Sequence, residues 1–268
     1  MNIAPLDDRE FKQFQAMIHR IAGISLSEPK KTLVVGRLLQ RIRKLGLPTF
    51  GAYFDRLSGD RTELQVAVDL LTTNETYFFR EPRHMDFLAD HVLPQHGERR
   101  TFRVWSAASS SGEESYTLAM VLADKLGEGR WEVLGSDIST RVLDKARHAH
   151  YSLERVEGIP GPYLKRFCLK GTGRQEGTFL VKPELCRNVS FHQVNLIKPL
   201  PALGLFDAIF LRNVMIYFDM ETKRRVVRSL LPLLRAGGYF FISHSESLNG
   251  VNDELRMVRP SVYRKPDV

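Results

Sequence analysis

The stretch from Phe102 to Met120 constrains this chain most strongly, because its pattern predicts a strand, a tight turn and the start of a helix. Phe102, Val104 and Trp105 favour a buried strand. The residues from Ser106 to Gly112 have almost no side-chain bulk, so the backbone can approach a ligand closely there. A strand, a turn and a helix in this order form the ligand-binding crevice of an open α/β sheet.

The chemistry of this turn excludes one group of ligands. It lacks the Gly-x-Gly-x-x-Gly pattern of dinucleotide-binding folds and the lysine of a phosphate-binding loop, so it is not built around a pyrophosphate. Glu113 and Glu114 follow it, and carboxylates suit a ligand with hydroxyl or ammonium groups. Acidic residues in a first helical turn also offset the helix dipole by roughly 0.3–1 kcal/mol, which would explain either glutamate without a ligand.

Composition narrows the class of protein further. A chain of 268 residues suits one large or two modest domains, and it has no apolar run long enough to span a membrane. Its two cysteines, Cys168 and Cys186, fit no common metal-binding pattern, so we expect no metal and a reduced, cytoplasmic protein. The net charge of +8 favours an acidic partner: nucleic acid, an anionic membrane or an acidic protein.

The first part of the chain has the periodicity of helices. Asp7 or Asp8 is expected to cap a first helix that ends at Gly23, and a second helix is expected over 31–44. Two further helices are expected around the apolar residues of 50–57 and 64–71. These patterns predict an all-helical N-terminal domain over residues 1–85.

From about residue 98 the pattern changes to alternating strands and helices. Strands are expected at 102–106, 131–136, 189–194, 206–211, 238–243 and 261–264, with helices at 113–126, 139–149 and 221–234. This alternation predicts a mostly parallel sheet covered on both faces, in a domain spanning 86–268. Within that domain, glycines, prolines and short β-prone runs indicate an inserted, hairpin-rich subdomain at about 158–192.

Asp137 lies at the expected end of the second strand, 25 residues after Gly112. An acidic residue at this position can accept hydrogen bonds from both hydroxyls of a ribose. It could instead cap the helix that begins near Ser139 or Thr140. The small-residue turn upstream favours the ribose interpretation.

Two other segments carry candidate site residues. Arg212 and Asn213 follow the buried strand that ends at Leu211, on the usual ligand side of such a sheet, and Tyr217 comes next as a possible pocket wall. The alternative is a loop arginine beside a core aromatic residue. Asn74, Thr76 and Arg80 lie where the two domains join, a common place for ligands, although a capping cluster and a surface arginine would look the same.

His244 and Glu246 invite an acid–base interpretation, because they follow a buried strand. Structural polar groups at a strand end explain them better, and we expect that role for both.

Six segments in order resemble the CheR family, the chemotaxis receptor glutamate O-methyltransferases. They are Thr73–Thr76 with Phe78–Arg80, Trp105–Glu114, Ser136–Ile138, Asn195-Leu196, Arg212–Phe218, and Gly237-Gly238 continuing through His244–Ser247. Ser115 departs from the pattern, which has Pro or Ala there. The resemblance covers nearly the whole chain. It implies a Rossmann-like, S-adenosylmethionine-dependent methyltransferase sheet, an all-helical N-terminal domain and a small inserted antiparallel β-subdomain.

The resemblance also implies site residues. The cofactor, S-adenosylmethionine or its product S-adenosylhomocysteine, is expected to contact Asn74, Thr76, Arg80, Glu114, Asp137, Asn195, Leu196, Arg212 and Asn213. Arg80 and Tyr217 resemble the residues nearest the reacting methyl group. Arg37, Arg41 and Lys44, on the basic helix expected over 31–44, would face acidic receptor helices, although a solvated helix face explains them equally well.

Further partners follow from the same resemblance. The expected substrates are the cytoplasmic helices of methyl-accepting chemoreceptors, with no nucleic acid bound, no membrane insertion, and a cytoplasmic location that includes receptor arrays at the membrane. The loop Gly171–Gly177 resembles the version of the β-subdomain that grips a C-terminal receptor peptide.

The expected reaction agrees with the residues. A glutamate carboxylate has an unperturbed pKa of about 4.3, so at pH 7 it is already ionised and needs no general base. A nucleic-acid methyltransferase is the first alternative, but amine-methylating enzymes of that class carry an Asp/Asn-Pro-Pro-Tyr/Phe motif where this chain has Arg-Asn-Val-Met. The second alternative is a non-catalytic module that senses the cofactor or its product.

Overall fold

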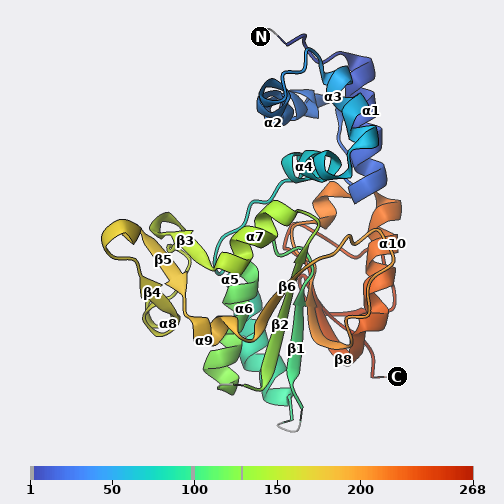
Figure 1. Cartoon of the computed structure of the whole chain (residues 1–268). Coiled ribbons are helices and arrows are strands. Elements are labelled where there is room, and N and C mark those ends of the chain that lie inside the picture. The colour runs from blue at the N-terminus through green and yellow to red at the C-terminus, as the bar shows by residue number, and fades with distance from the viewer. Residues whose placement is uncertain (1–2, 98–99, 128, 268) are drawn as a thin grey trace.

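The computed structural model describes residues 3–97, 100–127 and 129–267, so the outer limits of the expected domains, residues 1 and 268, lie outside the described residues. A group of helices near the N-terminus lies at one end of a large sheet, and a small separate sheet projects from the side (Figure 1). None of the described helices combines the length and the apolar character needed to cross a bilayer.

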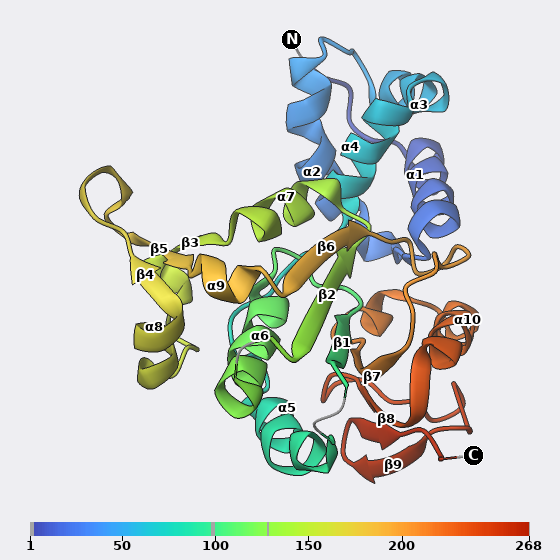
Figure 2. The same cartoon turned by 60° about the horizontal axis from the view of Figure 1, so that its bottom comes forward.

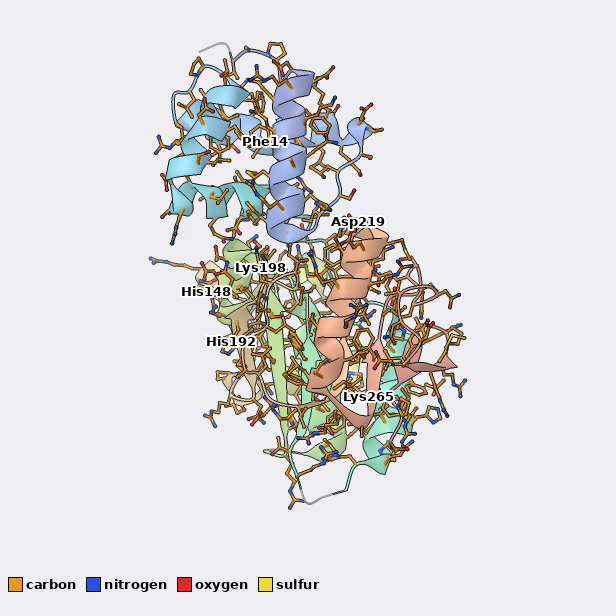
Figure 3. All side chains as sticks on the ribbon, turned by 90° about the vertical axis from the view of Figure 1, so that its right-hand side faces the viewer. Phe14, His148, His192, Lys198, Asp219 and Lys265 are labelled. Carbon is orange, nitrogen blue, oxygen red and sulfur yellow. The ribbon has the colours of Figure 1, made fainter. Side chains whose placement is uncertain are left out.

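Four helices form the N-terminal group: α1 (Asp8–Ala22), α2 (Lys31–Lys44), α3 (Phe50–Gly59) and α4 (Arg61–Leu71), with a 3-10 turn at Glu28–Lys30 before α2. Asp7 caps α1 and Glu10 returns a reciprocal bond, while Gly23 ends the helix at φ 72°. Among the described residues, the buried members of this core lie between Leu6 and Leu71 and include Phe14 (Figure 3), while Ile138 and Tyr217 pack against them from the sheet domain.

The chain then joins the sheet earlier than residue 85. Helix α5 (Pro82–Phe87) continues into a π-helical turn (Leu88–Val92) and a 3-10 turn (Leu93–Gln95). Met85, Leu88 and Val92 pack in the core of the sheet with α6 (Glu113–Leu126). The structural junction is therefore the extended segment between Leu71 and Pro82, and α5 lies on the sheet side of it.

The large sheet has seven strands in the order β6-β2-β1-β7-β8-β10-β9. The bounds are β1 (Phe102–Ser106), β2 (Trp131–Asp137), β6 (Val189–Gln193), β7 (Phe206–Phe210), β8 (Leu234–Phe241), β9 (Arg256–Arg259) and β10 (Val262–Arg264). The first five strands in this order run parallel, and β10 and β9 pair antiparallel at one edge. The S-adenosylmethionine-methyltransferase architecture expected from the sequence, a mixed sheet with a helical N-terminal domain and a small antiparallel sheet, is confirmed.

Both faces of the central strands β2, β1, β7 and β8 are largely buried, which explains their apolar sequences. Successive residues of β1 point to opposite sides, so Val104 joins the core under α6 and Trp105 joins the core under α10 (Met220–Leu230). Figure 2 shows α6 and α10 on opposite faces, with α7 (Thr140–His148) next to β6. The loops after the parallel strands consequently open at one edge, toward the N-terminal helices.

The small sheet has the order β3-β5-β4, with β3 (His150–Ser152), β4 (Cys168–Lys170) and β5 (Thr178–Val181) all antiparallel. It begins eight residues before the expected limit of 158, because β3 pairs with β5 and no glycine or proline marks it in the sequence. It also ends before 192, since β6 pairs with β2 in the large sheet. The remaining short elements are η4 (Leu153–Arg155), α8 (Gly161–Phe167), η5 (Gly173–Gln175), α9 (Pro183–Cys186), η6 (Met215–Tyr217) and η7 (Leu231–Leu233).

Candidate active site

A cavity of about 970 Å³, counting the space at its mouth, lies between the N-terminal helices and the carboxyl edge of the sheet. Its walls come from the end of α1, from the extended segment 72–80, and from the loops that follow β1, β2, β6 and β7. A hollow in this position is typical of small-molecule sites in open α/β sheets.

All ten residues expected from the sequence to contact the cofactor or the reacting methyl group line this cavity. They are Asn74, Thr76, Arg80, Glu114, Asp137, Asn195, Leu196, Arg212, Asn213 and Tyr217. They converge because the strands that precede most of them are neighbours in the sheet and end at one edge. Their individual contacts with a ligand stay predictions.

The small-residue turn forms the floor of the cavity. Ala107, Ala108 and Ser110 line it, and the approach of a ligand to their backbone stays a prediction. Ser110 has a left-handed backbone with φ 49°, and its amide donates to the Oδ2 atom of Asp137 at 3.0 Å. The turn and the end of β2 are therefore fixed to each other.

The structure leaves both interpretations of Asp137 open. Its second oxygen accepts from the amide of Ser139 at 2.9 Å, which shapes the entry to α7. The side chain also lines the cavity, and each carboxylate oxygen retains a lone pair for a ligand hydroxyl. Burial raises the pKa of Asp137 to about 6, against the opposing effect of backbone hydrogen bonds from Ser139, Ser110 and Ile138.

Arg212 is the centre of a buried charge network. Its guanidinium lies 2.9 Å from Glu114 and 3.0 Å from Glu81, and it donates to the carbonyl of Arg80 at 2.5 Å. Only 1% of its side chain is exposed. Ser106 donates to the other oxygen of Glu114 at 2.7 Å, while burial raises the pKa of Glu114 and Arg212 opposes that shift. Arg212 thus holds two walls of the cavity together.

Glu113 points away from this network. It is fully buried, pairs with Arg155, and accepts from the Ser111 hydroxyl at 2.7 Å. Burial raises the pKa of Glu113, and the hydrogen bonds and Arg155 counter that shift. Of the two adjacent glutamates, only Glu114 lines the cavity.

Arg80 lies half-buried at the cavity wall between two residues with left-handed backbone, Phe79 at φ 54° and Glu81 at φ 55°. Its Nη1 donates to the carbonyl of Glu75 at 3.0 Å, and its guanidinium stands 5.5 Å from the centre of the Tyr77 ring. Non-glycine residues in this conformation cost of order 1–3 kcal/mol each and cluster at functional sites.

The loop carrying Asn213 and Tyr217 is fixed by Glu246. This half-buried carboxylate accepts from the amides of Asn213 and Ile216 at 3.2 Å each, and from the amide of Ser243 at 2.9 Å. These bonds agree with the structural role expected for Glu246 from the sequence. Asn213 is itself left-handed, with φ 57°.

The two remaining residues expected to contact the cofactor, Asn195 and Leu196, have different roles in the wall. The side chain of Asn195 donates to the carbonyl of Ile21 at 2.6 Å and accepts from the amide of Ile197 at 3.2 Å, so it ties the loop after β6 to the end of α1. Leu196 is apolar and buried, and with Ile24 and Phe218 it makes the apolar part of the wall. An aromatic ring system would pack well against this part.

The N-terminal helices close the cavity through direct bonds to the sheet domain. The amide of Ser25 donates to the carbonyl of Tyr217 at 2.8 Å. His19 lies 2.7 Å from Asp219, at the start of α10 (Figure 3), and the pKa of Asp219 is lowered to about 2 by the Thr222 amide and by His19. Asp69 of α4 accepts from the amides of Thr140 and Arg141 at 3.1 and 3.2 Å, so it caps α7 from the other domain.

The three cations expected to face a receptor differ in whether they bind groups within this chain. Arg37 donates to the carbonyl of Leu71 at 2.6 Å and to Thr73 at 2.7 Å. Arg41 pairs with the buried Glu63. Lys44 is exposed at the end of α2. Two of the three therefore bind groups of this chain, because α2 packs against α4 and their long side chains reach polar atoms there.

Three residues of the site were not singled out from the sequence for these roles. Glu81 is the second carboxylate on Arg212, Asp69 caps α7, and Ser106 orients Glu114. Glu81 adjoins Arg80, which could have drawn attention to it. Nothing in the local pattern of α4 distinguishes Asp69 from a solvated acid.

Comparisons with known proteins agree with the fold. The family model described as CheR methyltransferase, SAM binding domain, matches residues 74–264, and the one described as CheR methyltransferase, all-alpha domain, matches residues 9–72. The chemotaxis protein methyltransferases of Salmonella typhimurium (strain LT2) and Escherichia coli (strain K12) are each 43% identical over 263 residues. That match covers 96% of this chain and 90% and 91% of those proteins.

A further relative is the chemotaxis protein methyltransferase 2 of Pseudomonas aeruginosa (strain PAO1). It is 44% identical over 257 residues, which are 95% of this chain and 92% of that protein. The similarity thus extends through both domains in these relatives, as the resemblance of the six segments predicted. From its two matched domains and this identity along its length, the chain belongs to the CheR family of S-adenosylmethionine-dependent methyltransferases.

Proposed function

We propose that this protein transfers the methyl group of S-adenosylmethionine to glutamate side chains on the cytoplasmic helices of chemoreceptors, which gives methyl esters. The observation that carries the proposal is the single cavity in which the acidic wall of Glu114 and Asp137 meets Arg80 and Tyr217. Membership of the CheR family supports the class of reaction.

The lining of the cavity fits the cofactor in charge and in hydrogen bonding. Three carboxylates, of Glu75, Glu114 and Asp137, face it against two guanidiniums, of Arg80 and Arg212. This excess of negative charge complements a ligand that carries a sulfonium, an ammonium and one carboxylate. Asp137 would accept from the ribose hydroxyls, and the wall of Leu196, Ile24 and Phe218 would hold the adenine ring.

For this reaction the protein has mainly to align the methyl donor with the acceptor carboxylate. When bound, S-adenosylmethionine supplies a methyl group on a positively charged sulfur, which leaves as a neutral thioether. The glutamate oxygen forms the new bond to carbon as the carbon–sulfur bond breaks, so no proton moves. A glutamate with a pKa near ~4.3 is ionised at pH 7, and no general base is needed. Positioning of two reactants can therefore supply most of the rate.

We assign that alignment to two side chains that line the cavity. In our proposal the Arg80 guanidinium binds the acceptor carboxylate and points one of its oxygens at the methyl group. The Tyr217 hydroxyl shapes the opposite side of the same space. The backbone strain at Phe79 and Glu81 fixes the direction of Arg80 before any ligand binds.

A second contact with receptors is proposed at the small sheet. Strand β4 is an edge strand, and Leu169 on it is 46% exposed. Unpaired backbone groups of an edge can accept a further strand, and a receptor's C-terminal peptide would supply one beside the loop Gly171–Gly177. This contact would keep the enzyme in the cytoplasm next to the receptor arrays.

Transfer of a radiolabelled methyl group to receptor-containing membranes tests the function. We expect the label in receptor protein, and we expect alkali to release it as methanol, because esters hydrolyse where methyl–nitrogen bonds do not. Alkali-stable label in added RNA or DNA would instead show a nucleic-acid methyltransferase. Binding of S-adenosylhomocysteine without transfer to any acceptor would show a sensing module.

A further inference from the structure

Glu81, which binds Arg212 in the cavity wall, also faces two histidines. The Nδ1 atom of His84, on α5, lies 3.3 Å from the Oε2 atom of Glu81. His244 follows β8, and the centre of its ring lies 4.7 Å from the centre of the His84 ring. One nitrogen or oxygen atom from each of the three side chains lies within 4.8 Å of the other two. The fold thus gathers three metal-binding residue types beside the active site.

The hydrogen bonds of Ser261 determine which nitrogen of His84 carries the proton. The Ser261 hydroxyl donates to the carbonyl of Pro260 at 2.6 Å, which uses its one proton. Its oxygen also lies 2.7 Å from the Nε2 atom of His84 and must accept there. Nε2 is therefore the protonated nitrogen, and Nδ1 carries a lone pair that points away from Ser261.

That lone pair has no donor. Only 2% of the His84 side chain is exposed, and no described group forms a hydrogen bond with Nδ1. The carboxylate of Glu81 that faces it is itself an acceptor. Burial lowers the pKa of His84 to about 3, with smaller effects from Arg212 and His244, so no second proton fills the gap near pH 7. Two buried acceptors that face each other without a donor are unfavourable, and a cation between them would satisfy both.

The spacing of these two atoms suits a zinc ion. Zinc binds imidazole nitrogen and carboxylate oxygen at about 2.0–2.2 Å, so a tetrahedral angle separates two ligand atoms by about 3.3–3.4 Å. The separation of Nδ1 of His84 and Oε2 of Glu81 is 3.3 Å. Histidines that bind metals usually donate their other N–H to a fixed acceptor, as His84 does to Ser261. His244 is exposed, so its ring can turn onto the ion and leaves a path from solvent.

We infer that Glu81, His84 and His244 form a binding site for a divalent transition-metal ion such as Zn²⁺, with water as a fourth ligand. Two imidazoles and one carboxylate are a donor set that zinc uses in proteins, whereas Mg²⁺ and Ca²⁺ prefer oxygen ligands. The cysteine pattern predicted no metal, but it bears only on sites built from cysteine. The inference does not depend on the proposed function, because metal binding requires no acceptor.

The metal site shares Glu81 with the cavity wall. Arg212 donates to Oε2 of Glu81 from Nη2 at 3.0 Å and from Nε at 3.3 Å, and its charge opposes a cation nearby. Glu114, the other acidic partner of Arg212, offsets part of that charge. An ion on Oε2 therefore competes with Arg212 for the carboxylate. Because Arg212 and Glu114 line the cavity, zinc should weaken cofactor binding, and by linkage the cofactor should weaken zinc binding by the same factor.

Zinc titration against a chromophoric chelator tests the site, with protein that carries no polyhistidine tag. We expect His244→Ala to bind Zn²⁺ more than about 10-fold more weakly than the wild type, because even the loss of an outer hydrogen-bond partner of a ligand costs about 10–100-fold. The variant keeps the backbone amide that donates to Glu81. His192→Ala, which removes an exposed histidine of β6, is the matched control and should bind Zn²⁺ like the wild type.

Calorimetric titration with S-adenosylhomocysteine tests the competition and shows that the variants are folded. Without metal, the wild type and both variants should give the same Kd, since neither histidine lines the cavity. With Zn²⁺ present, the Kd of the wild type and of His192→Ala should rise by at least about 5-fold, and that of His244→Ala should not. Mg²⁺ at the same concentration should have no effect.

Other results overturn the inference. Equal zinc affinity in the wild type and His244→Ala would remove His244 from any site, and a loss in His192→Ala of the same size would assign binding to scattered surface histidines. A wild type that binds Zn²⁺ no more tightly than Mg²⁺ would exclude the site. Zinc that binds through His244 without changing the Kd for S-adenosylhomocysteine would refute the competition with Arg212. None of these measurements involves methyl transfer, so a failure of the proposed function would leave the site standing.

Discussion

The cavity wall and the metal site share Glu81, and they differ in whether their polar groups already have partners. In the cavity wall, Arg212 is buried between Glu81 and Glu114. In the metal site, no described group forms a hydrogen bond with Nδ1 of His84, and His244 is exposed. The wall has its partners built in, whereas the metal site is open to an ion that arrives and leaves.

The difference teaches what each group can do. A buried ion pair is strongly destabilised when one member is removed, because the other is left without compensation in a poorly solvated place. An exposed histidine costs the fold little when it is changed. Mutations in the cavity wall should therefore change the stability of the fold, and mutation of His244 should change the affinity for metal. The predictions below test that contrast, beginning with the largest effect.

Arg212→Met should have the largest effect, because it leaves Glu81 and Glu114 facing each other without a cation. We expect the free energy of unfolding in urea to fall by about 3–5 kcal/mol. Arg225→Met, on the exposed face of α10, serves as the control and should change it by less than about 0.5 kcal/mol. A loss for Arg212→Met as small as that of the control would mean that the wall does not depend on this network.

Arg80→Ala should leave the fold intact and reduce turnover, since Arg80 is half-buried and outside the ion pairs of Arg212. By analogy with the removal of one charged or polar donor from an active site, we expect kcat to fall about 10²-fold. Arg83→Ala, an exposed position on α5, is the matched control. Initial rates of methyl transfer decide the point, and unchanged kcat would refute the role of Arg80.

Titration of Asp137 should affect ligand affinity and folding stability in opposite directions as pH changes. Its ionised form would bind the ribose, so affinity for S-adenosylhomocysteine should be constant above pH 6 and weaken up to about tenfold per pH unit below it. In the folded chain its pKa is raised to about 6 from 3.8, so the folded state binds the proton more strongly. This group's contribution to stability therefore decreases as pH rises from about 4 to 6.

Calorimetric titrations at several pH values, for the wild type and for Asp137→Asn, measure the first effect. The variant should bind more weakly and show a flatter profile in this window. Identical pH profiles would assign the titration to another group.

Asp69→Ala should lower the free energy of unfolding less than Arg212→Met does, and it probes an acid whose partners include backbone amides of the other domain. It removes the cap of α7 and should cost about 1 kcal/mol of unfolding free energy in urea. Asp60→Ala removes the cap of α4 within the N-terminal domain at similar cost. If Asp69→Ala leaves the free energy of unfolding unchanged while Asp60→Ala lowers it, the contact of Asp69 with α7 does not stabilise the fold.

The sequence predicted what depends on periodicity and on the order of strands. The strand, turn and helix from Phe102 onward, the acid at the end of β2 and the arginine after β7 all follow from residues close in the chain. Parallel strands bring their carboxyl ends to one edge, so the expected residues meet in one cavity without any knowledge of long-range contacts.

What the sequence could not predict depends on how the domains dock. Glu81 and Arg212 are 131 residues apart, and Asp69 and Thr140 are 71 apart. Neither pair has a periodic signal. The face of α2 gave a similar difficulty: Arg37 and Arg41 look solvent-exposed on a helical wheel, but α4 and the extended segment supply them with partners. The structural junction also lies before the expected domain limit at residue 85, because the apolar face of α5 packs on the sheet.

The extended segment that carries Asn74 and Arg80 lines the cavity and joins the two domains. A methyl donor that binds in the cavity orders this backbone. The entropic cost of binding the acceptor at Arg80 is then lower, and by linkage each ligand helps the other equally. Donor and acceptor should then each tighten the other's binding, with a ternary complex more stable than two independent affinities give. Spent donor should correspondingly dissociate faster once the modified receptor has departed.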